Sequence, residues 1–179
     1  ARIGGTLFPE LFRVFSSQEA FPAAIRARAC SVFHTCMKML AMVGGEHEAS
    51  ILAGLKPLLP GWFEWFGKVL GSPVQESDVG DIWLRMEVLK VVRLLGDDFP
   101  RVVSDILPPL MPLLWNCMVS CQAVYDRDVV FCNDGAADDV DSEGDRIGLD
   151  MLAAELLECL MGLVGTRPLR KQIKASLPQ

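Results

Sequence analysis

Carboxylates, the side chains whose chemistry is most evident in this chain, are concentrated in one 21-residue stretch, Asp126 to Arg146. Eight acids and two bases give this stretch the whole net charge of −6, and the rest of the chain is balanced. The carboxylates are Asp126, Asp128, Asp134, Asp138, Asp139, Asp141, Glu143 and Asp145. Clustered carboxylates attract Lys and Arg side chains and speed their encounter. The stretch is therefore predicted to be an acidic loop that binds basic proteins.

Two other interpretations of the stretch stay open. Its low hydrophobic content and like charge are also typical of a solvated, disordered loop with no partner. Calcium is the second alternative, because Asp139, Asp141, Glu143, Gly144 and Asp150 occupy positions 1, 3, 5, 6 and 12 of an EF-hand loop. The final ligand would be Asp rather than the longer Glu, which disfavours calcium.

The remaining reactive side chains show no catalytic spacing. The six cysteines form no Cys-x-x-Cys pair, and they are predicted to be reduced thiols, most of them on apolar helix faces: Cys30, Cys36, Cys117, Cys121, Cys132 and Cys159. Cys117 and Cys121 lie one helical turn apart, but two thiolates are half a zinc site. His34 and His47 have no recognisable nucleophile and acid partners. The chain is predicted not to be an enzyme and to use no metal or cofactor.

Composition excludes other classes of protein. Although 51% of the residues are hydrophobic, no apolar run reaches the ~18 residues of a membrane span, and no signal peptide is recognisable. Without a basic excess to neutralise phosphates, direct binding of nucleic acid is also disfavoured.

A repeated step organises the chain: apolar residues, a proline, then a dense apolar run. It occurs at Pro9, Pro60 and Pro108, and a fourth copy begins at Pro178. The intervals are 51, 48 and 70 residues, and removing the 21-residue acidic stretch shortens the last to 49. A period near 50 with helices between the steps is typical of stacked helical repeats.

Apolar periodicity predicts the helices that carry this repeat. They are expected over about 6–16, 23–43, 48–70 (bent at Pro57 or Pro60), 81–95, 99–121 and 147–164. Asp81 is the expected N-cap of the fourth. Its polar stripe is expected at Glu87, Lys90, Arg93 and Asp97. The apolar face of the second is expected at Ile25, Ala29, Val32, Phe33, Cys36, Met37 and Leu40. Trp62, Phe63, Trp65 and Phe66 are expected in the core.

The predicted fold is all-α, a HEAT-repeat α-solenoid in which antiparallel helix pairs form a superhelix with one long acidic loop. The whole chain, 1–179, is expected to be one solenoid fragment of a longer array. Its units are expected at about 1–16 (partial), 22–71, 81–125 and 147–179 (partial), with the loop at 126–146.

Several strings resemble the importin-β (karyopherin-β) family of nuclear transport receptors. In order they are Leu7 to Phe15, Arg85 to Lys90, Asp98 to Pro100, Ile106 to Pro108 with Leu114 to Asn116, and Val140 to Asp145. The resemblance covers nearly the whole chain. Gly71 to Gly80 and the start of the acidic stretch are the least similar parts.

The resemblance implies a receptor that wraps basic cargo, such as histones or ribosomal proteins, and carries it through the nuclear pore. It also implies regulation by the GTPase Ran through repeats mostly outside this chain, contacts with nucleoporins, and a location in cytoplasm and nucleus. Another HEAT scaffold without a transport role and a calcium-responsive module are the alternatives.

Overall fold

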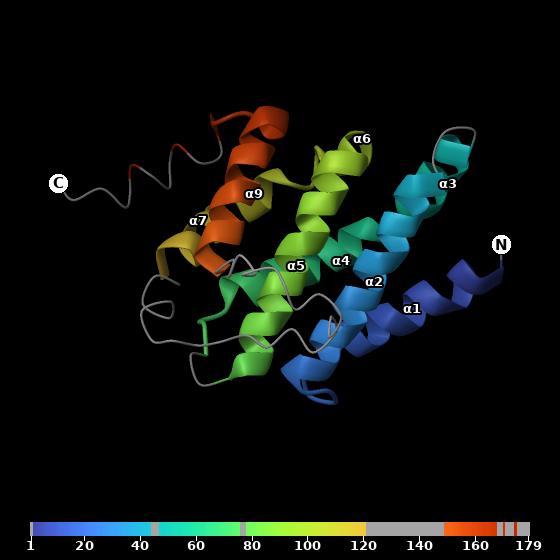
Figure 1. Ribbon diagram of the computed structural model, residues 1–179, viewed down its shortest axis with the longest axis horizontal. Coiled ribbons are helices and arrows are strands. Elements are labelled where there is room, and N and C mark those ends of the chain that lie inside the picture. The colour runs from blue at the N-terminus through green and yellow to red at the C-terminus, as the bar shows by residue number, and fades with distance from the viewer. Residues whose placement is uncertain are drawn as a thin grey trace, which may run out of the picture.

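The computed structural model describes residues 2–43, 47–75, 78–120 and 149–167, together with 170 and 174 (Figure 1). These residues are helical, with connecting turns and no strand. The α-helices are α1 (Arg2–Ser16), α2 (Ala23–Val43), α3 (Glu48–Leu55), α4 (Leu59–Gly71), α5 (Val79–Asp98), α6 (Pro100–Val103), α7 (Met111–Ser120) and α9 (Leu149–Val164). A short 3-10 turn, η2 (Pro108–Leu110), precedes α7.

The helices form two packed layers. In the first, α2, α5 and α9 lie side by side, with α5 in contact with both neighbours (Figure 1). Behind them α1 packs on α2, α4 on α5 and α7 on α9, while α4 also contacts α7. Helix-on-helix layers bury the apolar stripe of each helix against a neighbour. The all-helical architecture is confirmed among the described residues, and it is consistent with an α-solenoid.

Prolines break the second-layer helices rather than bend them. The helix predicted over 48–70 is two helices, α3 and α4, separated by the turn 56–58 that contains Pro57. Pro60 stands in the first turn of α4, where its missing N–H costs no hydrogen bond. The segment predicted as one helix over 99–121 is likewise divided into α6, η2 and α7. Pro9, by contrast, is accommodated in the interior of a helix, α1.

The beginning of α5 differs from the prediction by three residues. Its N-cap is Asp78, whose Oδ1 accepts a hydrogen bond from the backbone N–H of Gly80 at 2.9 Å. The predicted N-cap, Asp81, lies in the first turn and binds Arg85 instead. A side chain at position 80 would place its Cβ 2.9 Å from the backbone nitrogen of Ala24. Glycine therefore allows α5 to start close against α2.

Aromatic rings form the centre of the contact between α1, α2 and α4. The indole of Trp62 stacks on Phe33 with ring centroids 3.9 Å apart and on Phe15 at 4.9 Å. Phe12 and Phe66 complete the cluster around it. The predicted core positions are confirmed for Trp62, Phe63 and Phe66, which are buried, while Trp65 is partly exposed.

Two predictions about burial are wrong. Ile25 and Val32 were expected on the apolar face of α2, but each is nearly half exposed. Glu87 was expected in the outward polar stripe of α5, but it is only 4% exposed. α5 has α2 on one side and α9 on the other, and α2, which packs over one end of its polar stripe, supplies the reason for the burial of Glu87.

Candidate functional site

The acidic stretch predicted as the binding loop lies outside the described residues, as do all eight of its carboxylates. Its place in the chain is nevertheless defined by its flanks. α7 ends at Ser120, α9 begins at Leu149, and these two helices pack against each other. The stretch thus belongs to the connection between two neighbouring helices of the fold.

The predicted EF-hand positions also lie outside the described residues, except for Asp150 in the first turn of α9. Its buried Oδ1 has no hydrogen-bond partner among the residues that the structure describes. Within that part of the chain, no three His, Cys, Asp or Glu residues are grouped so that they could hold a metal ion. No described helix is long and apolar enough to cross a membrane.

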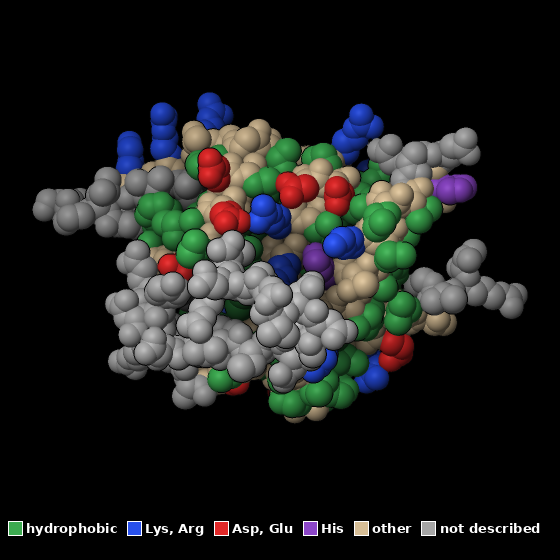
Figure 2. Space-filling model, viewed as in Figure 1, with side chains coloured by type: hydrophobic (Ala, Val, Ile, Leu, Met, Phe, Trp, Pro, Cys, Tyr) green, Lys and Arg blue, Asp and Glu red, His purple; other side chains and the backbone are tan. Residues whose placement is uncertain are grey.

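Charged side chains of alternating sign lie along the α2–α5–α9 layer, as Figure 2 shows over the middle of this face. The carboxylate of Glu87 accepts hydrogen bonds from Lys90 Nζ at 2.9 Å and from the indole N–H of Trp83 at 3.3 Å. Further along, Arg93 donates to Glu155 of α9 at 2.7 Å. The bonds to Glu87 lie within α5, and the bond of Arg93 links α5 to α9. This part of the surface therefore carries both positive and negative charges.

His34 of α2 lies near this line of charges, facing Glu87, Lys90 and Lys38. Burial lowers the pKa of its imidazole, and the two lysines lower it further while Glu87 raises it. A pKa below the ordinary value of about 6.5 leaves the ring neutral at pH 7. No nucleophile pairs with the ring among the described residues, so the arrangement fits packing.

Two buried arginines, which sequence reasoning missed, each satisfy the end of the preceding second-layer helix. Arg26 of α2 donates its Nε–H to the carbonyl of Phe15, near the end of α1, at 2.7 Å. Arg85 of α5 donates from Nη2 to the carbonyls of Ser72 and Pro73, just after α4, at 3.0 Å each. The last carbonyls of a helix have no partner within it, and cations stabilise that end. The sequence does contain a sign of their burial, because both arginines occupy apolar faces of their helices.

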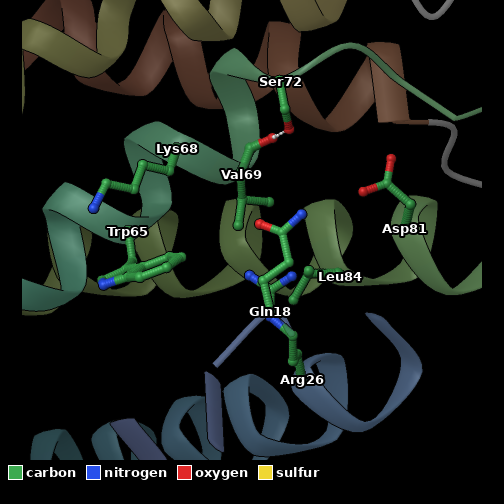
Figure 3. Close-up of a pocket in the computed structure, with 8 residues that line it drawn as sticks. All are labelled: Gln18, Arg26, Trp65, Lys68, Val69, Ser72, Asp81 and Leu84. Carbon is green, nitrogen blue, oxygen red and sulfur yellow. Dashed lines mark hydrogen bonds between the residues drawn. The ribbon is translucent and has the colours of Figure 1, made fainter. Parts of the chain in front are cut away.

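A polar hollow lies where the α1–α2 turn, α4 and α5 meet (Figure 3). Its volume is about 320 Å³ when its open mouth is counted. Figure 3 shows Gln18 and Arg26 entering from the α1–α2 side, with Asp81 on another wall. The polar residues that line it are Gln18, Arg26, Lys68, Ser72 and Asp81, beside the ring of Trp65. No local pattern in the sequence marks this site, because its lining residues are up to 66 positions apart.

The four described cysteines, Cys30, Cys36, Cys117 and Cys159, are free thiols, as predicted for them. Cys121 and Cys132 lie outside the described residues, so their reduced state stays a prediction. Burial raises the pKa of the Cys30 thiol well above its usual range and also raises that of Cys117. Neither thiol is therefore disposed to act as a nucleophile at neutral pH.

Cys159 is expected to be alkylated slowly for a partly exposed thiol. Burial and a 3.0 Å hydrogen bond from its Sγ to Asp97 Oδ1 raise its pKa to about 11. Since only the thiolate reacts, about one thiol in a thousand is reactive at pH 8, and the rate should rise roughly tenfold per pH unit up to pH 10. Replacing Asp97 with Asn should lower the pKa and speed the reaction. Iodoacetamide labelling followed by peptide mass mapping measures both, and a rate that is flat between pH 8 and 10 would contradict the assignment.

Comparison with known proteins adds one informative likeness. No protein-family model matches the chain. The chain is 19% identical to importin-9 of Drosophila melanogaster over 176 residues, which cover 96% of this chain and 17% of that protein. The chain therefore spans about a sixth of the length of that relative. An alignment of this length with an all-helical fold indicates an importin-β-like helical protein.

Proposed function

We propose that this chain is a HEAT-repeat segment of a nuclear import receptor similar to importin-9, and that it binds basic protein cargo through the acidic stretch at 126–146. The observation that carries the proposal is the likeness to importin-9 along 96% of the chain. The two helix layers and the recurring proline step support it, because both are features of stacked helical repeats.

The buried arginines are a second feature that two successive helix pairs share. Arg26 and Arg85 are 59 residues apart, stand early in two neighbouring helices of one layer, and each bind carbonyls at the end of the preceding helix in the other layer. Equivalent side chains with equivalent contacts are expected when a structural unit repeats. The proposed units remain about 22–71 and 81–125, with partial units at 1–16 and 147–179.

The described helices carry a balance of charge, whereas the acidic stretch carries −6. Exposed charges of one sign raise the association rate of an oppositely charged partner and confer a steep dependence on salt. The stretch is therefore the element of this chain best suited to attract histones or ribosomal proteins. It lies between α7 and α9 in the chain, so its substitutions leave the sequence of every described helix unchanged.

Neutralising five of its carboxylates is expected to weaken cargo binding. The substitutions are Asp138→Asn, Asp139→Asn, Asp141→Asn, Glu143→Gln and Asp145→Asn. At low salt, the association rate with a histone dimer should fall roughly tenfold, and its dependence on salt should flatten, because steering by these charges is lost. Stopped-flow mixing at several salt concentrations measures both, with circular dichroism to verify that helical content is retained.

A matched control removes five exposed carboxylates elsewhere and causes the same change in net charge. Its substitutions are Glu10→Gln, Glu19→Gln, Glu64→Gln, Asp105→Asn and Glu158→Gln. Equal effects from both sets would mean that net charge alone matters and would leave the stretch a passive loop. In the intact protein, release of cargo on addition of Ran loaded with GTP is expected of a transport receptor. Retention of cargo would favour a HEAT scaffold without a transport role.

A further inference from the structure

The hollow between the α1–α2 turn, α4 and α5 contains a largely buried cation that forms no ion pair with a described residue. Arg26 is only 5% exposed, and its Nε–H is bound to the carbonyl of Phe15. Its guanidinium carbon lies 5.8 Å from the ring centre of Phe15, and the side chain lines the hollow, where Figure 3 draws no hydrogen bond from it to another lining residue. A charge in a largely buried side chain is costly unless an anion lies close to it. The guanidinium is thus the feature of this site that calls for a ligand.

The carboxylate that shares the hollow does not neutralise this cation directly. Asp81 forms its ion pair with Arg85 at 2.9 Å and also accepts the backbone N–H of Gln75 at 3.2 Å. No ion pair joins it to Arg26 within the described residues, although its charge acts on the guanidinium across the hollow. Burial lowers the pKa of Arg26 more than Asp81 raises it. The guanidinium therefore remains available to an incoming anion.

The other walls add hydrogen-bonding groups and a limit on size. The side chain of Gln18 reaches the hollow beside Arg26, and Figure 3 draws no hydrogen bond from it to another lining residue. Lys68 stands at the hollow, with its Nζ bound to Glu64 at 2.8 Å and over the ring of Trp65 at 4.3 Å. The space inside the hollow is about 60 Å³, which admits one small side-chain group rather than a nucleotide or a large cofactor.

We propose that this hollow binds a single oxyanionic side chain of a partner peptide, a carboxylate or a phosphoryl group, with Arg26 as the main ligand and Gln18 as the second. A guanidinium offers parallel N–H donors that match a carboxylate or a phosphate bidentately. The site is distinct from the acidic stretch and selects the opposite charge. It gives this segment a way to bind an acidic or phosphorylated partner while basic cargo is bound elsewhere.

Titration of the 179-residue chain with three acetylated, amidated tripeptides tests the proposal. They are Gly-Glu-Gly, Gly-phosphoserine-Gly and Gly-Gln-Gly. Binding is followed by calorimetry and by tryptophan fluorescence, to which Trp65 at the hollow contributes. At least one anionic peptide should bind about tenfold or more tightly than the Gln peptide, since hydrogen bonds to charged groups are the stronger ones. The tighter of the two anionic peptides identifies the carboxylate or the phosphoryl group as the natural ligand. Equal binding of all three, or no saturable binding, would mean that the hollow holds water only and would overturn the proposal.

Variants locate the binding in the hollow. Arg26→Gln should reduce affinity for the anionic peptide about tenfold or more, whereas Lys38→Gln, an exposed lysine of the same helix outside the hollow, should have no effect. Because Arg26 also binds Phe15, its loss could unfold α2, so Gln18→Leu provides a second variant in a side chain with no such structural bond. A folded Gln18→Leu chain should bind at least severalfold more weakly. Unchanged affinity in Gln18→Leu together with an equal loss in Lys38→Gln would show that the peptide binds elsewhere.

Discussion

Replacing Arg85 with Met is expected to lower the free energy of unfolding by about 3–5 kcal/mol, the cost of leaving one partner of a buried ion pair alone. The Arg85 side chain is 1% exposed, and its Nε donates to Asp81 Oδ2 at 2.9 Å. Its Nη2 binds the carbonyls of Ser72 and Pro73 at 3.0 Å each. Met fills a similar volume but provides no donor, so a largely buried carboxylate and two carbonyls lose their partner. Urea unfolding followed by circular dichroism at 222 nm measures the loss.

The chain contains a matched control for this substitution. Arg13 pairs with Glu10 at 2.8 Å across one helical turn, but both side chains are more than 60% exposed. Exposed pairs contribute roughly 0–1 kcal/mol, so Arg13→Met should change stability little. Adding Asp81→Asn to Arg85→Met should recover part of the loss, because the charge left unpaired is removed. Equal, small effects of Arg85→Met and Arg13→Met would show that the buried network does not stabilise the fold.

Helix positions were largely predictable, because apolar periodicity and prolines are local signals. The segment 23–43 coincides with α2, and the segment predicted to end near residue 164 coincides with the end of α9. The pattern alone did not show whether a proline would bend a helix or end it. Pro57 lies in a turn that separates α3 from α4, and after this turn α4 packs against α5. Whether a proline bends or ends a helix depends on such neighbours.

Buried charges were harder to predict, because their partners come from other parts of the fold. Arg26 is 11 residues after the carbonyl that it binds, and Arg85 is 12 and 13 residues after its two carbonyl partners. Glu87 is the exception. Its donors, Trp83 and Lys90, lie on the same helix at spacings of four and three residues, so its satisfied burial was detectable in the sequence. The hollow at Arg26 combines three separate segments, and no periodic pattern marks such a meeting.

The acidic stretch, unlike the buried charges, is easier to recognise in the sequence than in the structure. Its charge is evident from composition alone, because eight carboxylates occur within 21 residues. In the chain it lies between α7 and α9, which are in contact. Partner choice depends on the arrangement of charges rather than on their number, so composition indicates the sign of a partner and not its identity.

Replacing Trp62 with Ala is expected to lower the free energy of unfolding by about 3–5 kcal/mol, as for other large core aromatics. The indole is 1% exposed and stacks on Phe33 and Phe15, which belong to two other helices. Its loss removes the largest side chain at the junction of α1, α2 and α4 and leaves a cavity that fixed helices cannot close. For a chain of this length the midpoint of thermal unfolding should fall roughly 10 °C, since about 1 kcal/mol corresponds to 2–4 °C.

Trp65 supplies a control that separates the effect of burial from the effect of removing an indole. It stands three residues further along α4, so Trp65→Ala removes the same atoms from the same helix. That indole is partly exposed, with Lys68 Nζ 4.3 Å from its ring centre. Because part of its surface already faces solvent, Trp65→Ala should cost at least about 2 kcal/mol less than Trp62→Ala. Thermal unfolding of the two variants side by side measures the difference. Equal shifts would mean that the aromatic cluster around Trp62 contributes no more to stability than an ordinary half-buried contact, and that α1 and α2 are held to α4 by other side chains.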